Sequence, residues 1–323
     1  MNKNFRTMDT IEYAGVSRYQ GLQVLLSGKL GTWGPFRNVN TNVTYAFSRF
    51  NASSTDQDFL FAAINNDNLT SFYGPSNLDR THQLGVSFIA DLPAHFRIST
   101  TTEYRSNEAS IGIFDQAGPD AAGEIFISDF NGDGTIGDPI PGTNRGDYGR
   151  KIRSGTDLNR VLNKYNSSSG GILTPAGQAL VNAGLFTQPQ LVALNATTPK
   201  VDAQCDPTIN PSAPVNCIQL ASSGQINNPN FYTTDVRLSW RYSFAERLTI
   251  EPMVDIFNVL NRMNGVGTGS DGRGGNTALD GTLSTASGSI NGTTHIPERV
   301  GAGSGSFSSG TPRAFQFGIR VSF

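Results

Sequence analysis

The last eleven residues of the chain, Arg313 to Phe323, constrain its fold more than any other stretch. Apolar and polar side chains alternate there without a break, and the apolar positions are Phe315, Phe317, Ile319, Val321 and Phe323. Because successive side chains of a strand point to opposite faces, the pattern predicts one strand with a wholly apolar face. A strand of a soluble sandwich could alternate in the same way. The run, however, approaches the roughly 9–11 residues with which a tilted strand crosses a bilayer, and it ends on an aromatic residue.

Further segments show the same period of two. They are Arg18–Leu30, Asn38–Phe50, Arg80–Ala90, His95–Arg105, Tyr232–Tyr242 and Arg247–Leu260. With a short strand-like piece at Thr10–Tyr13, the pattern predicts about eight strands, an even number.

The connections between these segments alternate in length. Short turns are expected at 31–35, 91–94 and 243–246, and long excursions at 51–79, 106–229 and 262–311. Barrels of the bacterial outer membrane have short periplasmic turns and longer extracellular loops, whereas a soluble sandwich has no reason to separate its loops by length. We therefore expect an all-β fold: an antiparallel transmembrane β-barrel with about eight C-terminal strands present and long extracellular loops that contain short helices. Residues 1–323 would form one partial barrel domain, and residues 106–229 a long extracellular loop insertion within it.

Composition narrows the possible functions. The chain has 323 residues and a net charge of −2, which gives no electrostatic reason to expect nucleic acid as a partner. No window approaches 18 consecutive apolar residues, so the sequence predicts no transmembrane helix. The first residues contain no apolar run after the lysine and hence no signal peptide. An outer-membrane protein must be exported, so we expect a fragment whose signal peptide lies in a missing N-terminal part.

Several strings resemble the carboxy-terminal barrel of TonB-dependent receptors, specifically the Oar-like group with very long loops. They are GPSNLDRTHQLGVSFIADLP (Gly74–Pro93), TPAGQALVNAGLF (Thr174–Phe186) and DVRLSWRYSF…LTIEPMVDIFNVLN (Asp235–Asn261). Phe257–Asn261 resembles the FNxxN end of a penultimate strand in such receptors, and Arg313 before the closing strand also matches. The final strand, through Phe315, Phe317, Ile319, Val321 and Phe323, resembles the signal that the barrel assembly machinery reads.

The resemblance implies a larger barrel with an amino-terminal plug and a segment that contacts TonB. The expected function is therefore that of the C-terminal part of a TonB-dependent outer-membrane receptor or transporter, which takes up a large solute. Its expected partners are outer-membrane lipid, the barrel assembly machinery, and TonB only through the missing N-terminal regions. The alternative is a structural or adhesive surface barrel without active transport, and a third interpretation is a soluble secreted β-protein.

An enzyme is the least supported class. The chain has no GxSxG, HExxH or phosphate-loop motif, and its three histidines, His82, His95 and His295, are far apart in the sequence. We therefore predict no catalytic residues.

One loop motif predicts a bound cation. Oxygen-bearing side chains alternate in the segment that starts DFNGDG, and the candidate Ca²⁺ ligands are Asp129, Asn131, Asp133, Thr135 and Asp138. Carboxylate and amide oxygens at alternate positions, with Gly134 at the sixth, match the first half of a calcium loop. The twelfth position is Ile140, where an EF-hand needs a bidentate glutamate. A turn rich in Asx and glycine residues is the other interpretation.

Three further features of the chain have two interpretations each. Cys205 and Cys217, the only cysteines, predict either a disulfide in an exported loop or two free thiols. Two short helices are expected at Asp157–Tyr165 and Pro175–Leu185, the second capped by Thr174, with Leu180, Val181 and Leu185 packed on the rim or a neighbouring loop. Charged side chains on the polar face of the last strands predict either a solute path or charges that pair with each other or with a plug. These lumen-facing residues are Arg237, Arg241, Glu251, Asp255 and Arg320.

Overall fold

The computed structural model describes about five eighths of the chain. The described residues are 15–53, 65, 68–76, 78–107, 109, 125–134, 138–144, 146–147, 149–201, 217–218, 220, 230–244, 248–262, 264–266, 298–299 and 312–323. The strand predicted at Thr10–Tyr13 lies outside them, as do Thr135, Cys205 and His295. Of Cys217 only the backbone is described, so the predicted disulfide stays a prediction.

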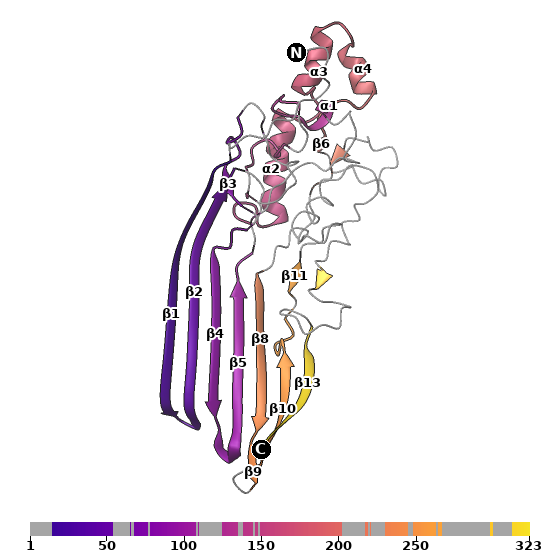
Figure 1. The fold of residues 1–323 in the computed structure, drawn as a ribbon. Helices are drawn as coiled ribbons and strands as arrows, with labels where there is room; N and C mark the ends of the chain where they lie inside the picture. The colour runs from indigo at the N-terminus through magenta and orange to yellow at the C-terminus, as the bar shows by residue number, and fades with distance from the viewer. Residues whose placement is uncertain are drawn as a thin grey trace.

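A nine-stranded antiparallel sheet dominates the structure (Figure 1). Seven strands follow one another in the order β1-β2-β4-β5-β8-β10-β13, while β3 pairs with β2 and β9 pairs with β10. Their bounds are β1 Ser17–Trp33, β2 Phe36–Ala52, β3 Gly74–Pro75, β4 His82–Asp91, β5 Phe96–Arg105, β8 Phe231–Trp240, β9 Tyr242–Phe244, β10 Leu248–Phe257 and β13 Ala314–Ser322. The predicted antiparallel sheet is thus confirmed.

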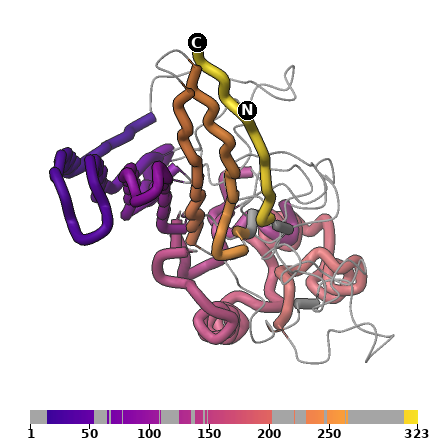
Figure 2. The backbone as a smooth tube through the Cα atoms, turned by 90° about the horizontal axis from the view of Figure 1, so that it is seen from below, coloured from indigo at the N-terminus to yellow at the C-terminus, as the bar shows by residue number. Residues whose placement is uncertain are grey.

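The two ends of this sheet do not meet in the part of the chain that the structure describes. There, β1 pairs only with β2, and β13 pairs only with β10. Figure 2 shows β1 and β13 on different sides of the molecule. Closure of the sheet into a barrel therefore stays a prediction.

The short connections lie at one end of the sheet and the long ones at the other, as the sequence predicts (Figure 1). The first hairpin is longer than predicted, because β1 continues to Trp33 and the chain reverses at Gly34, whose φ is 60°. A 3₁₀ turn at Pro93–His95 joins β4 to β5, with Ala94 and His95 in the left-handed region at φ 58° and 67°. Trp240 holds this turn, since its indole Nε1 donates to the Ala94 carbonyl at 3.0 Å.

The register places polar side chains together on one face. Asp91 lies opposite Arg97, Asp255 opposite Arg237, and Glu251 opposite Arg320. On the other face Ile98 lies opposite Leu238, and Val254 opposite both Leu238 and Phe317. Partners in an antiparallel ladder point to the same side, so the sheet has one polar and one apolar face.

The FNVLN string ends β10 through its two asparagines. Asn258 and Asn261 both adopt positive φ, at 46° and 49°, which asparagine tolerates better than most residues. The Asn258 side chain donates to the Arg262 carbonyl at 2.8 Å and accepts from the Arg262 N–H at 3.0 Å. Asn261 Oδ1 accepts the Arg313 N–H at 3.3 Å, which ties the start of the last strand to the end of β10.

The helices belong to the long insertion, at the end of the sheet opposite the short turns (Figure 1). They are α1 Ile125–Ser128, α2 Gly155–Ser168, α3 Pro175–Asn182 and α4 Gln188–Ala193. Two-residue strands also occur there and in the last loop: β6 Lys200–Val201 pairs with β7 Cys217–Ile218, and β11 Gly265–Val266 pairs with β12 Glu298–Arg299. No helix in the described ranges is long and apolar enough to cross a membrane.

The two predicted helices form, with different ends. Ser154 caps α2 by accepting the Asp157 N–H, so the helix begins two residues before the predicted Asp157. Thr174 caps α3 by accepting the Gly177 N–H, as predicted, but α3 ends at Asn182 rather than Leu185. Leu185 is 68% exposed, so the packing predicted for it is wrong: the chain turns away at Gly184, whose φ is 68°. Helices α1 and α4 were not predicted.

The hydrophobic core of the described residues lies in the insertion, not under the sheet. It consists of Ile140, Ile152, Leu158, Leu162, Tyr165 and Val201, each at most 6% exposed. Tyr165 also donates its hydroxyl to the Pro199 carbonyl at 2.8 Å, and burial raises the pKa of this phenol. The insertion therefore packs as a small unit of its own at the end of the sheet.

Candidate functional site

Acid–base pairs occupy the polar face of the last strands. The Arg237 guanidinium contacts the Asp255 carboxylate through two hydrogen bonds, Nε to Oδ1 at 2.5 Å and Nη2 to Oδ2 at 2.9 Å. Such a two-point contact fixes both orientation and distance between β8 and β10. The pair lies between neighbouring strands at matched register positions.

Glu251 is the centre of a second group on the same face. Its side chain is 9% exposed and accepts from the Ser239 hydroxyl at 2.8 Å. Arg241, between β8 and β9, approaches it at 3.4 Å, and Arg320 approaches it from β13 at 3.8 Å. All five charged residues predicted to line a lumen thus lie on one face and pair with one another.

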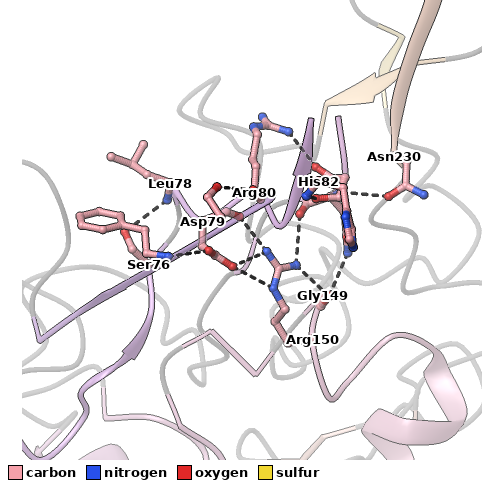
Figure 3. Close-up of polar contacts among 12 residues, drawn as sticks. Ser76, Leu78, Asp79, Arg80, His82, Gly149, Arg150 and Asn230 are labelled. Carbon is pink, nitrogen blue, oxygen red and sulfur yellow. Dashed lines mark hydrogen bonds and ion pairs between the residues drawn. The ribbon is translucent and has the colours of Figure 1, made fainter. Parts of the chain in front are cut away.

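A buried ion pair joins the sheet to the insertion (Figure 3). Arg150 Nη2 lies 2.7 Å from Asp79 Oδ2, and the side chains are 17% and 4% exposed. Arg150 also donates to the Asp79 carbonyl at 2.7 Å, while Asp79 Oδ1 accepts the Phe50 N–H at 2.7 Å. The Asp79 carboxylate thereby links the end of β2 to the loop before α2.

The other donors of Arg150 extend this contact to the ends of β5 and β8. Arg150 Nη1 donates to the carbonyls of Asn107 and Gly149, both at 3.1 Å. Asn107 in turn donates its backbone N–H to Asn230 Oδ1 at 2.9 Å, just before β8 begins. We call Asp79, Asn107, Arg150 and Asn230 the rim latch, because they hold the insertion on the end of four strands.

Glycine allows the backbone to approach closely beside the rim latch. A Cβ atom on Gly146 would lie 2.4 Å from the Pro75 carbonyl oxygen, and the φ of Gly146 is 71°. The sequence did not predict the ion pair between Asp79 and Arg150, because these residues are 71 positions apart and both lie in loops. The short string RGDYGR around these residues contained no pattern that would identify its partner.

The carboxylates of the predicted calcium loop are occupied by N–H groups. Asp129 accepts the N–H groups of Gly132 at 2.6 Å and Gly134 at 2.9 Å. Asp138 accepts from the Phe130 N–H at 2.8 Å and from the backbone and side chain of Asn131 at 3.1 and 2.7 Å. The Asp133 N–H is bonded to Asn131 Oδ1 at 2.8 Å. This is the geometry of an Asx-rich turn, the second interpretation of the motif.

No group of three or more His, Cys, Asp and Glu side chains is placed for a metal ion among the described residues. The calcium site accordingly stays a prediction. Burial raises the pKa of Asp138 to about 6, although the N–H donors favour its ionised form, and burial also raises the pKa of Asp129.

The predicted assembly signal and two of the three histidines lie in or next to strands of the sheet. The residues of the assembly signal lie on one face of β13 and its end and are exposed: Phe315 54%, Phe317 80%, Ile319 72%, Val321 53% and Phe323 102%. His82 begins β4 and accepts from or donates to the Tyr45 hydroxyl at 2.9 Å, whereas His95 lies in the turn at the opposite end of that strand.

Comparison with solved structures gives a likeness of low similarity to an outer-membrane protein. The crystal structure of the outer membrane transporter YddB from Escherichia coli aligns with 96% of this chain at 10% identity and a TM-score of 0.38. The chain spans about a quarter of the length of that transporter, 26%. No protein-family model matches the sequence, and no curated protein matches it either.

The rim latch predicts a specific effect of the Arg150→Ala substitution. Removal of one partner from a buried pair costs about 3–5 kcal/mol, because the other charge is left without compensation. At about 3 kcal/mol, the amides of α2 would exchange hydrogen about 100-fold faster in the variant, while those of β4 and β5 keep their rates. The exposed pair of Arg160 and Asp157 provides the control: Arg160 is 75% exposed, so Arg160→Ala changes exchange only slightly. Equal effects of the two substitutions would contradict this role of the latch.

The loop of Asp138 predicts a pH-dependent stability. Its folded pKa of about 6 lies above the ordinary aspartate value, so the folded loop binds more protons than the unfolded one between pH ~4 and ~6. The stability of the loop therefore falls as the pH rises through this window. Hydrogen exchange of residues 129–134, corrected for the intrinsic rate, should be slower at pH 5 than at pH 7, and Asp138→Asn should remove the difference. Asp157→Asn, in the first turn of α2 and away from this loop, should preserve it.

Calcium would reverse that loss, because a bound cation favours the ionised carboxylates. We expect about 1 mM Ca²⁺, in the range of extracellular calcium modules, to slow exchange of residues 129–134 at pH 7. No change with Ca²⁺ at that concentration would refute the calcium prediction and leave the Asx-rich turn.

Proposed function

We propose that this chain is the C-terminal part of the β-barrel of a TonB-dependent outer-membrane receptor or transporter. The observation that most strongly supports this proposal is the exposed apolar face of the sheet. On β1 the exposed fractions of Leu22, Leu26 and Leu30 are 60%, 62% and 52%, and on β13 Phe317 and Ile319 reach 80% and 72%. A continuous apolar face of this extent marks an interaction surface, and no hydrophobic core among the described residues covers it.

The positions of the aromatic side chains support a lipid partner for this face. Phe96 lies opposite Trp240 near the short-turn end, and Tyr104 lies opposite Tyr232 near the insertion. These two rows are eight residues apart, which at ~3.3 Å per residue is about 26 Å along the strand, or a height of about 18–21 Å for a strand tilted by about 35–45°. An outward apolar band about 25 Å tall with aromatic residues at both borders is typical of outer-membrane barrels.

Polar groups between the aromatic rows bond one another. The hydroxyls of Thr102 and Thr234 lie 3.0 Å apart, and Thr234 donates to the Tyr232 hydroxyl at 3.2 Å. Unpaired hydroxyl groups would be costly in hydrocarbon, so these bonds suit a lipid-facing position. The paired charges of Arg237 and Asp255 then face an aqueous interior.

The outer edges of β1 and β13 pair with no further strand among the described residues, which favours a piece of a larger barrel. Backbone N–H and C=O groups along the outer edges of β1 and β13 cannot be satisfied by lipid, so further strands must cover them. A barrel that contains these further strands is wide enough for a plug and a solute path. For this reason we favour uptake of a large solute through coupling to TonB.

A structural or adhesive surface barrel is the second candidate, and the rim latch favours it. A packed insertion held by a buried ion pair offers a rigid surface outside the membrane. The two functions differ in their energy requirement: dissipation of the proton gradient should stop solute accumulation by a transporter but leave binding by an adhesin unchanged.

The proposed orientation is tested by cysteine labelling of the intact receptor in cells, with Cys205 and Cys217 replaced by serine. A membrane-impermeant maleimide should label Leu185→Cys on intact cells, because Leu185 lies in the insertion and is exposed. Ala94→Cys, in an exposed turn at the other end of the sheet, should react only after the outer membrane is opened. Labelling of Ala94→Cys on intact cells would contradict the proposed topology.

A further inference from the structure

The polar face of the sheet has two halves of different chemistry. On β8, β10 and β13 it presents the paired charges described above. On β1, β2, β4 and the adjoining part of β5 it presents mainly uncharged carboxamides and hydroxyls. These side chains, from the register of the ladder, are Gln23, Ser27, Asn40, Asn42, Thr44, Gln83, Ser87, Ser99 and Thr101. We call this half the neutral wall.

A hollow of about 610 Å³ lies in the neutral wall. It lies between two rows of cross-strand partners, Gln23–Ala46–Gln83–Arg105 and Leu25–Thr44–Gly85–Glu103. The residues between these rows, among them Val24 and Leu84, point to the apolar face and so leave the space free. Small residues line it, among them Ala46 and Gly85, and the Thr44 side chain lies over Gly85, where a Cβ atom would come within 2.7 Å of Thr44 Oγ1. The volume is within the ~300–1,000 Å³ that ligand pockets occupy.

The hollow carries no unpaired charge. Its two ionic side chains, Glu103 and Arg105, bond to each other, and Arg105 also lies over the Phe231 ring at 5.3 Å from its centre. An ionic ligand would therefore have to break an existing pair or lose its hydration without compensation.

The carboxamides of the wall are available for a ligand. Gln23, Asn42 and Gln83 are exposed, and their side chains make no hydrogen bond with any described residue. Each carboxamide offers both donors and an acceptor, which complements groups that donate and accept at once, above all hydroxyls.

An aromatic ring lies on the same face of β1, four residues from Gln23 of the hollow. Tyr19 lies on the same face, 57% exposed, and its ring bends over Gly21, where a Cβ would come within 2.7 Å of the hydroxyl and 3.1 Å of ring carbons. Gly21 adjoins Gln23 on that face of β1, so the ring and the free carboxamides form one surface. An exposed ring beside carboxamides suits a ligand with apolar C–H faces and many hydroxyls.

From this arrangement we infer that the neutral wall binds an uncharged oligosaccharide. The inference rests on the proposed function, since it names the class of solute that the receptor takes up. A neutral sugar chain matches the hollow in charge, its hydroxyls match the carboxamides, and its ring faces match Tyr19. An extended peptide is the competing ligand, but its backbone offers separate donors and acceptors and no flat apolar face for the tyrosine.

The test is binding of the purified intact receptor, in detergent, to an array of neutral oligosaccharides, acidic oligosaccharides and neutral peptides. We expect capture by neutral oligosaccharides. The variants Gln83→Ala and Asn42→Ala should each weaken it about three- to tenfold, the effect of losing one or two hydrogen bonds. Gln23→Glu should weaken it further, because the cross-strand partner of Gln23 is Ala46, so the added charge is left unpaired in the hollow. Gln316→Glu, on the charged half of the same face, is the matched control and should leave binding unchanged.

Each other outcome overturns the inference. Preference for acidic sugars or for peptides would contradict it, as would capture that Gln83 and Gln316 variants affect equally. Absence of capture by the whole array, with cysteine labelling as proposed above, would refute the neutral wall as a sugar site but leave the receptor function intact. Failure of the labelling pattern would instead refute the membrane topology, whatever the array shows.

Discussion

The register of the antiparallel ladder is the constraint on which the rest of this structure depends. Side chains alternate with a period of two, and a shift by one residue would exchange the two faces along a whole strand. The observed register sets Ile98 against Leu238 and Arg237 against Asp255, so mainly apolar residues share one face and mainly polar residues the other, across strands far apart in the sequence. An exposed apolar face, a wall of paired charges and a neutral wall all follow from that one alignment.

Hydrogen bonds and an ion pair at the strand ends stabilise this register. Trp240 clamps the strained turn at Ala94, and the asparagines of the FNVLN string end β10 and receive the start of β13. At the other end, the rim latch fastens a separately packed insertion to four strand ends through Asp79 and Arg150. The hydrophobic core of the described residues lies in the insertion, and in the proposed receptor lipid would cover one face of the sheet.

Features formed by residues close together in the sequence were predictable, whereas features formed by residues far apart were not. Strands were predictable because the alternation at Arg313–Phe323 and its counterparts is local, and so was the cap of α3, because Thr174 and Pro175 are adjacent. The charged residues of β8 and β10 were predicted to share a face, because they alternate with apolar residues along each strand. The rim latch and the hollow were not predictable, since Asp79 meets Arg150 across 71 residues and the hollow needs the register of four strands. The end of α3 was also a local feature, but it was overlooked: Gly184 adopts a positive φ and stops the helix before the predicted Leu185.

The central claim is that one face of this sheet lies in lipid, and spin labelling of the last strand in the intact receptor tests it most directly. Nitroxides would be placed one at a time from Phe315 to Ser322, and their collisions with oxygen and with a water-soluble relaxing agent compared in lipid vesicles. Oxygen collisions should peak at Phe315, Phe317, Ile319 and Val321, which are exposed on the apolar face, with the water-soluble agent favoured at the positions between them. Equal access of the water-soluble agent to both sets would contradict the account.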